Sequence, residues 1–65
     1  MKRKEIVNLA KKIAKLEMIV QDKDSTNQEI NAAQDEIMKL SSHVKNFEDL
    51  MEIDELVMEI LSKNS

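Results

Sequence analysis

The chain contains neither glycine nor proline among its 65 residues. Turns between β-strands depend on Gly, Asn and Asp, and small all-β chains rarely lack both Gly and Pro. Most of the residues are Ala, Leu, Ile, Met, Glu, Lys or Gln, which favour helices. An apolar fraction of 42% is too high for a disordered acidic tail. The sequence therefore predicts an all-α fold.

A chain this short forms a single domain, residues 1–65, and has little room for a large core. It contains no Cys and one His, so disulfides, thiolate metal sites and His-rich metal sites are excluded within one chain. Regular helix packing and oligomerisation are the remaining sources of stability for a protein of this size.

Apolar residues recur with alternating spacings of 3 and 4 in two segments, a pattern typical of the buried seam of a helix. The first segment has Ile6, Leu9, Ile13, Leu16 and Val20. The second has Ile30, Ala33, Ile37, Leu40, Val44, Phe47 and Met51. We predict helices over residues 3–22 and 25–62, joined by a polar turn at 22–25.

The polar turn carries two overlapping capping boxes, Ser25-x-x-Gln28 and Thr26-x-x-Glu29. In a capping box the hydroxyl accepts from a backbone N–H while the Glu or Gln accepts from the backbone N–H of the cap residue. The pattern indicates that a helix begins here, with either hydroxyl as its cap.

Folding the chain at this turn pairs the two seams in antiparallel order. The predicted layers are Val20 with Ile30, Leu16 with Ala33, Ile13 with Ile37, Leu9 with Leu40, and Ile6 with Val44. The two residue numbers of each layer add to the same value within one, as a helical hairpin with one turn requires.

The segment 48–61 extends beyond the end of the first helix and is rich in apolar residues that need cover. In the arrangement we favour, the second helix runs unbroken to residue 62 and packs on another copy of the chain in a dimeric four-helix-type bundle. The heptad pattern continues through residues 41–47 and places Phe47 in the core. In the alternative, the helix breaks near Asn46, within residues 42–48, and a third helix folds back to give a monomeric or dimeric three-helix bundle. Asn46 followed by Glu48 and Asp49 is a suitable N-cap with a negative first turn.

Two further stripes lie outside the hairpin seam. They are Val7, Ala10, Ala14 and Met18 in the first helix, and Leu50, Ile53, Val57 and Ile60 in the second. We predict that they form the interface of a homodimer; under a folded-back third helix they would be core instead.

No constellation of acid, base, nucleophile or metal ligand is present, so we predict a protein that is not an enzyme and needs no cofactor or metal. His43 stands beside Ser41 and Ser42, but residues one or two apart on a helix do not face each other. No apolar run is long enough for a membrane span, and we expect a cytoplasmic protein.

Charge divides the chain in two. Residues 1–23 carry seven Lys or Arg and three Asp or Glu, a net charge of +4, whereas residues 24–65 carry three and ten, a net charge of −7. The acids Glu48, Glu52, Glu55 and Glu59 are spaced 4, 3 and 4 along one helix face.

We predict a small regulatory or adaptor protein that binds another protein through its acidic and apolar C-terminal segment. Its contact residues would be Glu48, Met51, Glu52, Glu55, Met58 and Glu59. A structural self-assembly module is one alternative. An RNA- or DNA-binding hairpin dimer is another, using Lys4, Lys11, Lys12 and Lys15 against phosphates. The net charge of −3 and the single aromatic residue make nucleic acid the weaker hypothesis.

Overall fold

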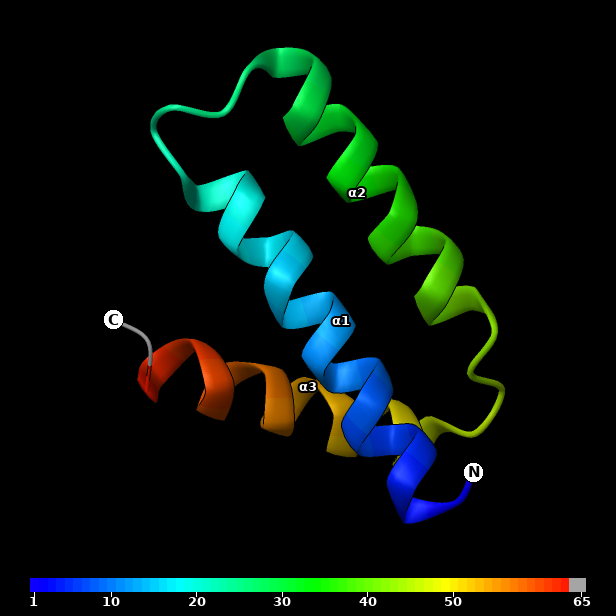
Figure 1. The fold of residues 1–65 in the computed structure, drawn as a ribbon. Helices are drawn as coiled ribbons and strands as arrows, with labels where there is room; N and C mark the ends of the chain where they lie inside the picture. Colours follow the sequence, from blue (N-terminus) through cyan, green and yellow to red (C-terminus); the bar gives the residue numbers. More distant parts are fainter. Residues whose placement is uncertain (64–65) are drawn as a thin grey trace.

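A computed structural model describes residues 1–63, which form three α-helices: α1 (Arg3–Gln21), α2 (Asn27–Ser42) and α3 (Phe47–Lys63). Helices α1 and α2 run antiparallel side by side, and α3 crosses the N-terminal half of α1 (Figure 1). No strand occurs among residues 1–63. The all-α prediction is confirmed.

The α1–α2 hairpin brings together the residues of two of the five predicted layers. Leu9 and Leu40 line one shallow depression between the two helices, and Leu16 and Ala33 line another. Ala33 is buried. The connection between the two helices is short and contains neither Gly nor Pro. A short connection holds the two apolar seams in one constant register.

The turn before α2 selects one of the two capping boxes. The backbone N–H of Glu29 donates to Thr26 Oγ1 (3.2 Å), and the Thr26 N–H donates to Glu29 Oε1 (2.9 Å). Thr26 has extended backbone angles, and α2 begins at the next residue. The Thr26 box therefore forms, and the helix starts two residues later than residue 25.

Replacing Thr26 with Ala is expected to lower the free energy of unfolding by about 0.5–2 kcal/mol, because Thr26 Oγ1, which accepts from the Glu29 N–H, is lost, whereas the backbone N–H at residue 26 remains. Ser25→Ala, one position away, is the matched control and should change stability much less. Urea unfolding followed by circular dichroism at 222 nm measures both variants. Equal losses for the two would contradict the assignment of Thr26 as the cap.

The chain breaks between α2 and α3, so the expectation of one helix to residue 62 is wrong. Ser42 Oγ donates to the Lys39 carbonyl (2.8 Å), a local bond that competes with helix continuation. The N–H groups of His43 and Val44 donate to carbonyls three residues back, which tightens and ends the helix. Asn46 Oδ1 then accepts from the Glu48 N–H (2.9 Å) and caps α3. The predicted alternative, with Asn46 as N-cap, describes the fold.

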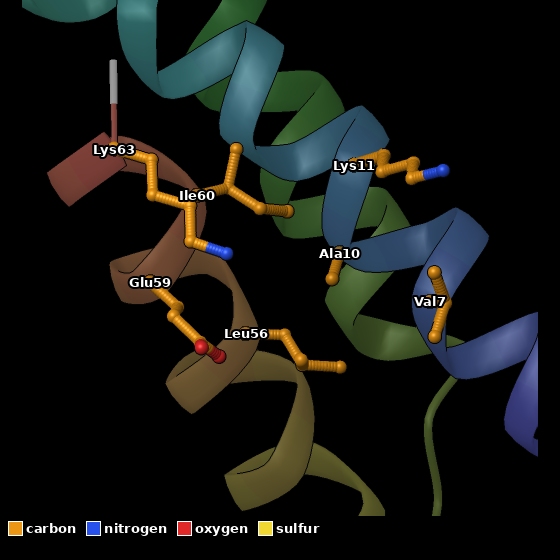
Figure 2. Close-up of a pocket in the computed structure, with 7 residues that line it drawn as sticks. All are labelled: Val7, Ala10, Lys11, Leu56, Glu59, Ile60 and Lys63. Carbon is orange, nitrogen blue, oxygen red and sulfur yellow. The ribbon is translucent and has the colours of Figure 1, made fainter.

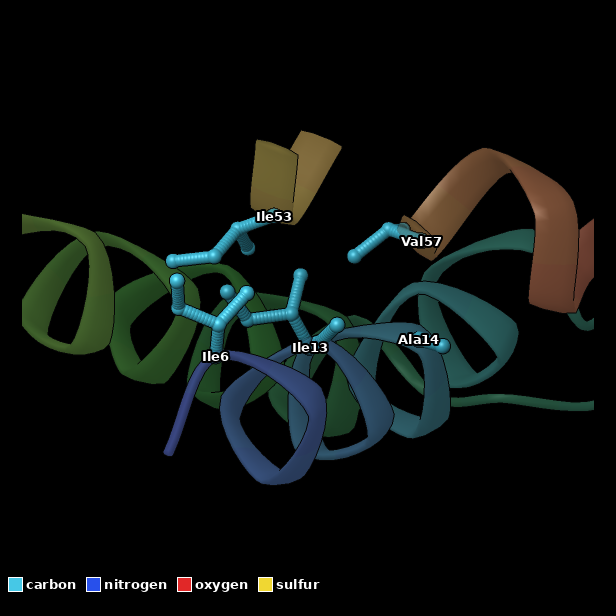
Figure 3. Close-up of a cluster of buried hydrophobic side chains, with 6 residues drawn as sticks. Ile6, Ile13, Ala14, Ile53 and Val57 are labelled. Carbon is cyan, nitrogen blue, oxygen red and sulfur yellow. The ribbon is translucent and has the colours of Figure 1, made fainter. Parts of the chain in front are cut away.

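Helix α3 supplies the cover for α1. Ile53 and Val57 face Ile6, Ile13 and Ala14 across the core (Figure 3). The core also contains Ala10, which is 0% exposed, and Ile53 is 1% exposed. Small side chains on α1 allow the two helices to approach closely.

Half of the predicted dimer interface is therefore interior to one chain. Ala10, Ala14, Ile53 and Val57 are buried between α1 and α3 of one chain. They form the core under a folded-back helix, which was the alternative. The other four predicted interface residues keep part of their surface: Val7, Leu50 and Ile60 are half-buried, and Met18 is exposed.

Phe47 is 72% exposed, so its predicted core position is also wrong. The prediction assumed that the heptad of α2 continues to residue 47. The four residues between α2 and α3 are not helical. The side of the helix on which Phe47 lies therefore depends on where α3 begins, and the heptad of α2 no longer determines it.

Candidate functional site

The outward side of α3 carries three large apolar side chains in the open. Phe47, Met51 and Met58 are 72%, 51% and 70% exposed. At 3.6 residues per turn, spacings of 4 and 7 place all three on one side of the helix. That side lies away from Ile53 and Val57, which face the core. We call Phe47, Met51 and Met58 the apolar stripe.

Carboxylates border the apolar stripe along both edges. Helical periodicity places Asp54 on one edge and Glu48, Glu55 and Glu59 on the other. All four are exposed. We call these four residues the acidic border, and the stripe with its border the α3 surface.

The remaining two acids of α3 face α1 and are paired there. Asp49 Oδ2 accepts from the amino group of Met1 at 3.0 Å, and Glu52 forms an ion pair with Arg3. In the part of the chain that the structure describes, no residue of the acidic border forms an ion pair. The fold thus separates two structural acids from four acids that face solvent.

Five of the six predicted protein-binding residues share the α3 surface: Glu48, Met51, Glu55, Met58 and Glu59. The sixth, Glu52, is half-buried and paired with Arg3, so it belongs to the α1–α3 contact. Phe47 and Asp54 lie on the same surface and are not among the six predicted residues. Asp54 does not belong to the glutamates that are spaced 4, 3 and 4 along the helix. It borders the apolar stripe because Phe47, seven residues before it, is exposed.

The four lysines predicted for nucleic-acid binding are all exposed on α1: Lys4, Lys11, Lys12 and Lys15. Spacings of 7 and 4 place Lys4, Lys11 and Lys15 in one row, with Lys12 beside it. The sole aromatic residue, Phe47, lies on α3, so this basic row has no aromatic side chain for base stacking on its own helix.

A depression of about 160 Å³ lies between α1 and α3 (Figure 2). Val7, Ala10, Leu56 and Ile60 form its apolar lining, and Lys11, Glu59 and Lys63 complete it. Pockets that enclose small molecules usually measure about 300–1,000 Å³. This depression is a seam between two helices rather than a cavity for a drug-sized ligand.

His43 is exposed at the C-terminal end of α2, where its backbone N–H caps the helix. Among residues 1–63, no three or more His, Cys, Asp or Glu side chains are grouped to hold a metal ion. None of the three described helices is long and apolar enough to cross a membrane.

Comparisons with protein-family models, with curated proteins and with solved structures found no match to this chain.

Proposed function

We propose that this chain is a small, non-enzymatic regulatory or adaptor protein that binds another protein through the α3 surface. The observation that supports this proposal is the exposure of Phe47, Met51 and Met58 together on one side of α3. Single exposed apolar residues are common on proteins, whereas a row of three large ones on one helix face marks an interaction site.

The residue types of the α3 surface suit protein recognition. Aromatic side chains and Met are enriched in protein interfaces, and Met adapts its shape to different partners. An apolar centre with a charged rim is also the usual anatomy of such an interface. The rim sets orientation and association rate, and the centre supplies most of the affinity.

Replacing Met51 and Met58 together with Ser is expected to reduce binding of the partner by tenfold or more, on the order of 1.4 kcal/mol or above. Both side chains are exposed, so circular dichroism should show an unchanged fold. The partner is first captured by crosslinking from extract of the source cell. It is then purified and titrated with each variant by calorimetry.

Met38→Ser is the matched control, because Met38 is 70% exposed, like Met58, but lies on α2. The proposal predicts that this variant binds the partner as the unchanged chain does. It is overturned if the Met51/Met58 double variant keeps full affinity, or if Met38→Ser weakens binding as much.

A homodimer is the second candidate, in which the α3 surface is covered by a second copy and the chain acts as a self-assembly module. The same exposed stripe favours it, now without Ala10, Ala14, Ile53 and Val57 in the interface. Light scattering across a dilution series separates the two proposals. A mass of two chains that falls to one chain in the Met51/Met58 variant supports self-assembly.

A further inference from the structure

We infer that the segment that docks on the α3 surface is a basic amphipathic helix of a partner protein. This inference rests on the proposed function and names the chemistry of its partner. Three observations carry it: the unbalanced charge of the α3 surface, the straight shape of the apolar stripe, and the closed backbone of α3.

The charge of α3 is only partly balanced by the rest of the chain. Residues 46–61 contain six acids and no Lys or Arg, and the helix has one cation, Lys63, in its last turn. Asp49 and Glu52 are paired with the amino group of Met1 and with Arg3, on the side facing α1. The other four acids are those that border the apolar stripe, and Glu59 among them also lines the α1–α3 depression with Lys11 and Lys63 (Figure 2).

Folding thus concentrates the unpaired negative charge of α3 around its exposed apolar residues. A partner that brings Lys or Arg to both edges of the stripe gains favourable contacts, whereas an acidic partner meets repulsion. Because Glu55 and Glu59 are one turn apart, they also repel each other, and a bound cation relieves that repulsion. The complementary segment is therefore cationic.

The apolar stripe is a single row along a helix. From Phe47 to Met58 the stripe is about 16 Å long, which corresponds to eleven residues or three turns of helix. A row of this width and length matches the apolar row of an amphipathic helix, whose i, i+3, i+4 and i+7 residues lie on one side. Basic residues on both flanks of that row would meet Asp54 on one edge and the glutamates on the other.

The backbone of α3 excludes the main alternative mode of peptide binding. An extended peptide docks by adding a strand to a sheet edge, which offers free N–H and C=O groups. Helix α3 is α-helical over Phe47–Lys63, so its backbone groups between the two ends are hydrogen-bonded within the helix. Side chains alone must hold the partner, and Met51, Met58 and Phe47 provide adaptable contacts and an aromatic face for a cation.

Three fluorescent model helices of about 18 residues, long enough to span the stripe, test the inference. All share one row of Leu, and the remaining positions are mainly Lys, Gln or Glu. Anisotropy titrations with the full chain should give at least tenfold tighter binding for the Lys helix than for the Gln helix. The Glu helix should not bind. Raising the salt from about 50 to 300 mM should weaken the Lys helix several-fold.

Two charge-neutralising variants locate the effect. Glu55→Gln with Glu59→Gln should weaken the Lys helix about tenfold, whereas Asp35→Asn with Glu36→Gln should leave binding within about twofold. Both pairs remove two exposed acids, the first from α3 and the second from α2. Equal losses in the two variants would show general attraction to an acidic protein and would overturn the inference. Equal binding of the Gln and Lys helices would also overturn it.

The failure of this inference is distinguishable from failure of the proposed function. If the captured partner loses affinity on Met51/Met58 substitution but not on Glu55/Glu59 neutralisation, the α3 surface binds a protein whose docking segment is not basic. If Met51/Met58 substitution has no effect on the captured partner, the proposed function itself fails. If the stripe proves to be covered by a second copy of the chain, as shown by light scattering, a basic partner helix is not its occupant.

Discussion

Removing residues 47–65 is expected to unfold the chain instead of leaving a stable α1–α2 hairpin. Of the seven residues that are buried within residues 1–63, six belong to the cluster between α1 and α3. Ala33 alone lies outside that cluster. Without α3, the buried face of α1 is exposed to water, and helices of 16–19 residues in proteins owe most of their stability to such packing. Helical ellipticity per residue should fall to a small fraction of that of the full chain.

Adding α3 back as a separate peptide, residues 44–63, provides the control for this truncation. The peptide should restore helicity and cooperative thermal unfolding at concentrations high enough to offset the freedom lost on association, and progressively less on dilution. Circular dichroism of each part and of the mixture measures the effect. A truncated chain that unfolds cooperatively without the peptide would show that α1 and α2 alone make the core.

Replacing Ile53 with Ala is expected to lower the free energy of unfolding by about 2–5 kcal/mol, the usual cost of truncating a fully buried Ile. Among residues 1–63, Ile53 is the largest fully buried side chain, and it faces Ile6 and Ile13 from α3 (Figure 3). A domain of this size has a total stability of about 3–10 kcal/mol. The variant should therefore be largely destabilised, with a midpoint of urea unfolding lower by about 2 M or more.

Met58→Ala on the same helix is the matched control. Met58 is mostly exposed, so this variant should stay within about 0.5 kcal/mol of the unchanged chain. The contrast separates the two folds considered for residues 46–61. If α3 extended away from its own hairpin, Ile53→Ala would spare the hairpin, and a loss no larger than that of Met58→Ala would contradict the fold-back.

Much of the α3 surface could be predicted from the sequence, because its acids and methionines recur at helical spacings. The place of Phe47 on this surface could not be predicted, since the side of the helix on which Phe47 lies depends on where the helix restarts after residue 46. Glu52 shares the spacing of the other glutamates, and only the approach of Arg3 assigns it to the α1–α3 contact. Periodicity shows which residues lie on one face of a helix, but it does not show which other helix or chain that face contacts.

The sequence by itself determined the helical class, the α1–α2 hairpin with its register, the start of α2 near Thr26 and the capping capacity of Asn46. Each of these depends on residue type, on helical spacing, or on the fixed register that one short turn imposes on two apolar seams, and all three can be read from the sequence. Only the tertiary structure decided how residues 46–61 are covered.

Both a second copy and α1 of the same chain could bury Ile53 and Val57, and the local pattern is the same for each. Association with a second chain costs about 4–15 kcal/mol in lost freedom, which an intramolecular contact avoids. Breaking one helix after Ser42 costs a few backbone hydrogen bonds, and Ser42 and Asn46 replace part of them. The balance of these terms folds α3 onto α1, and it leaves Phe47, Met51 and Met58 on the outside.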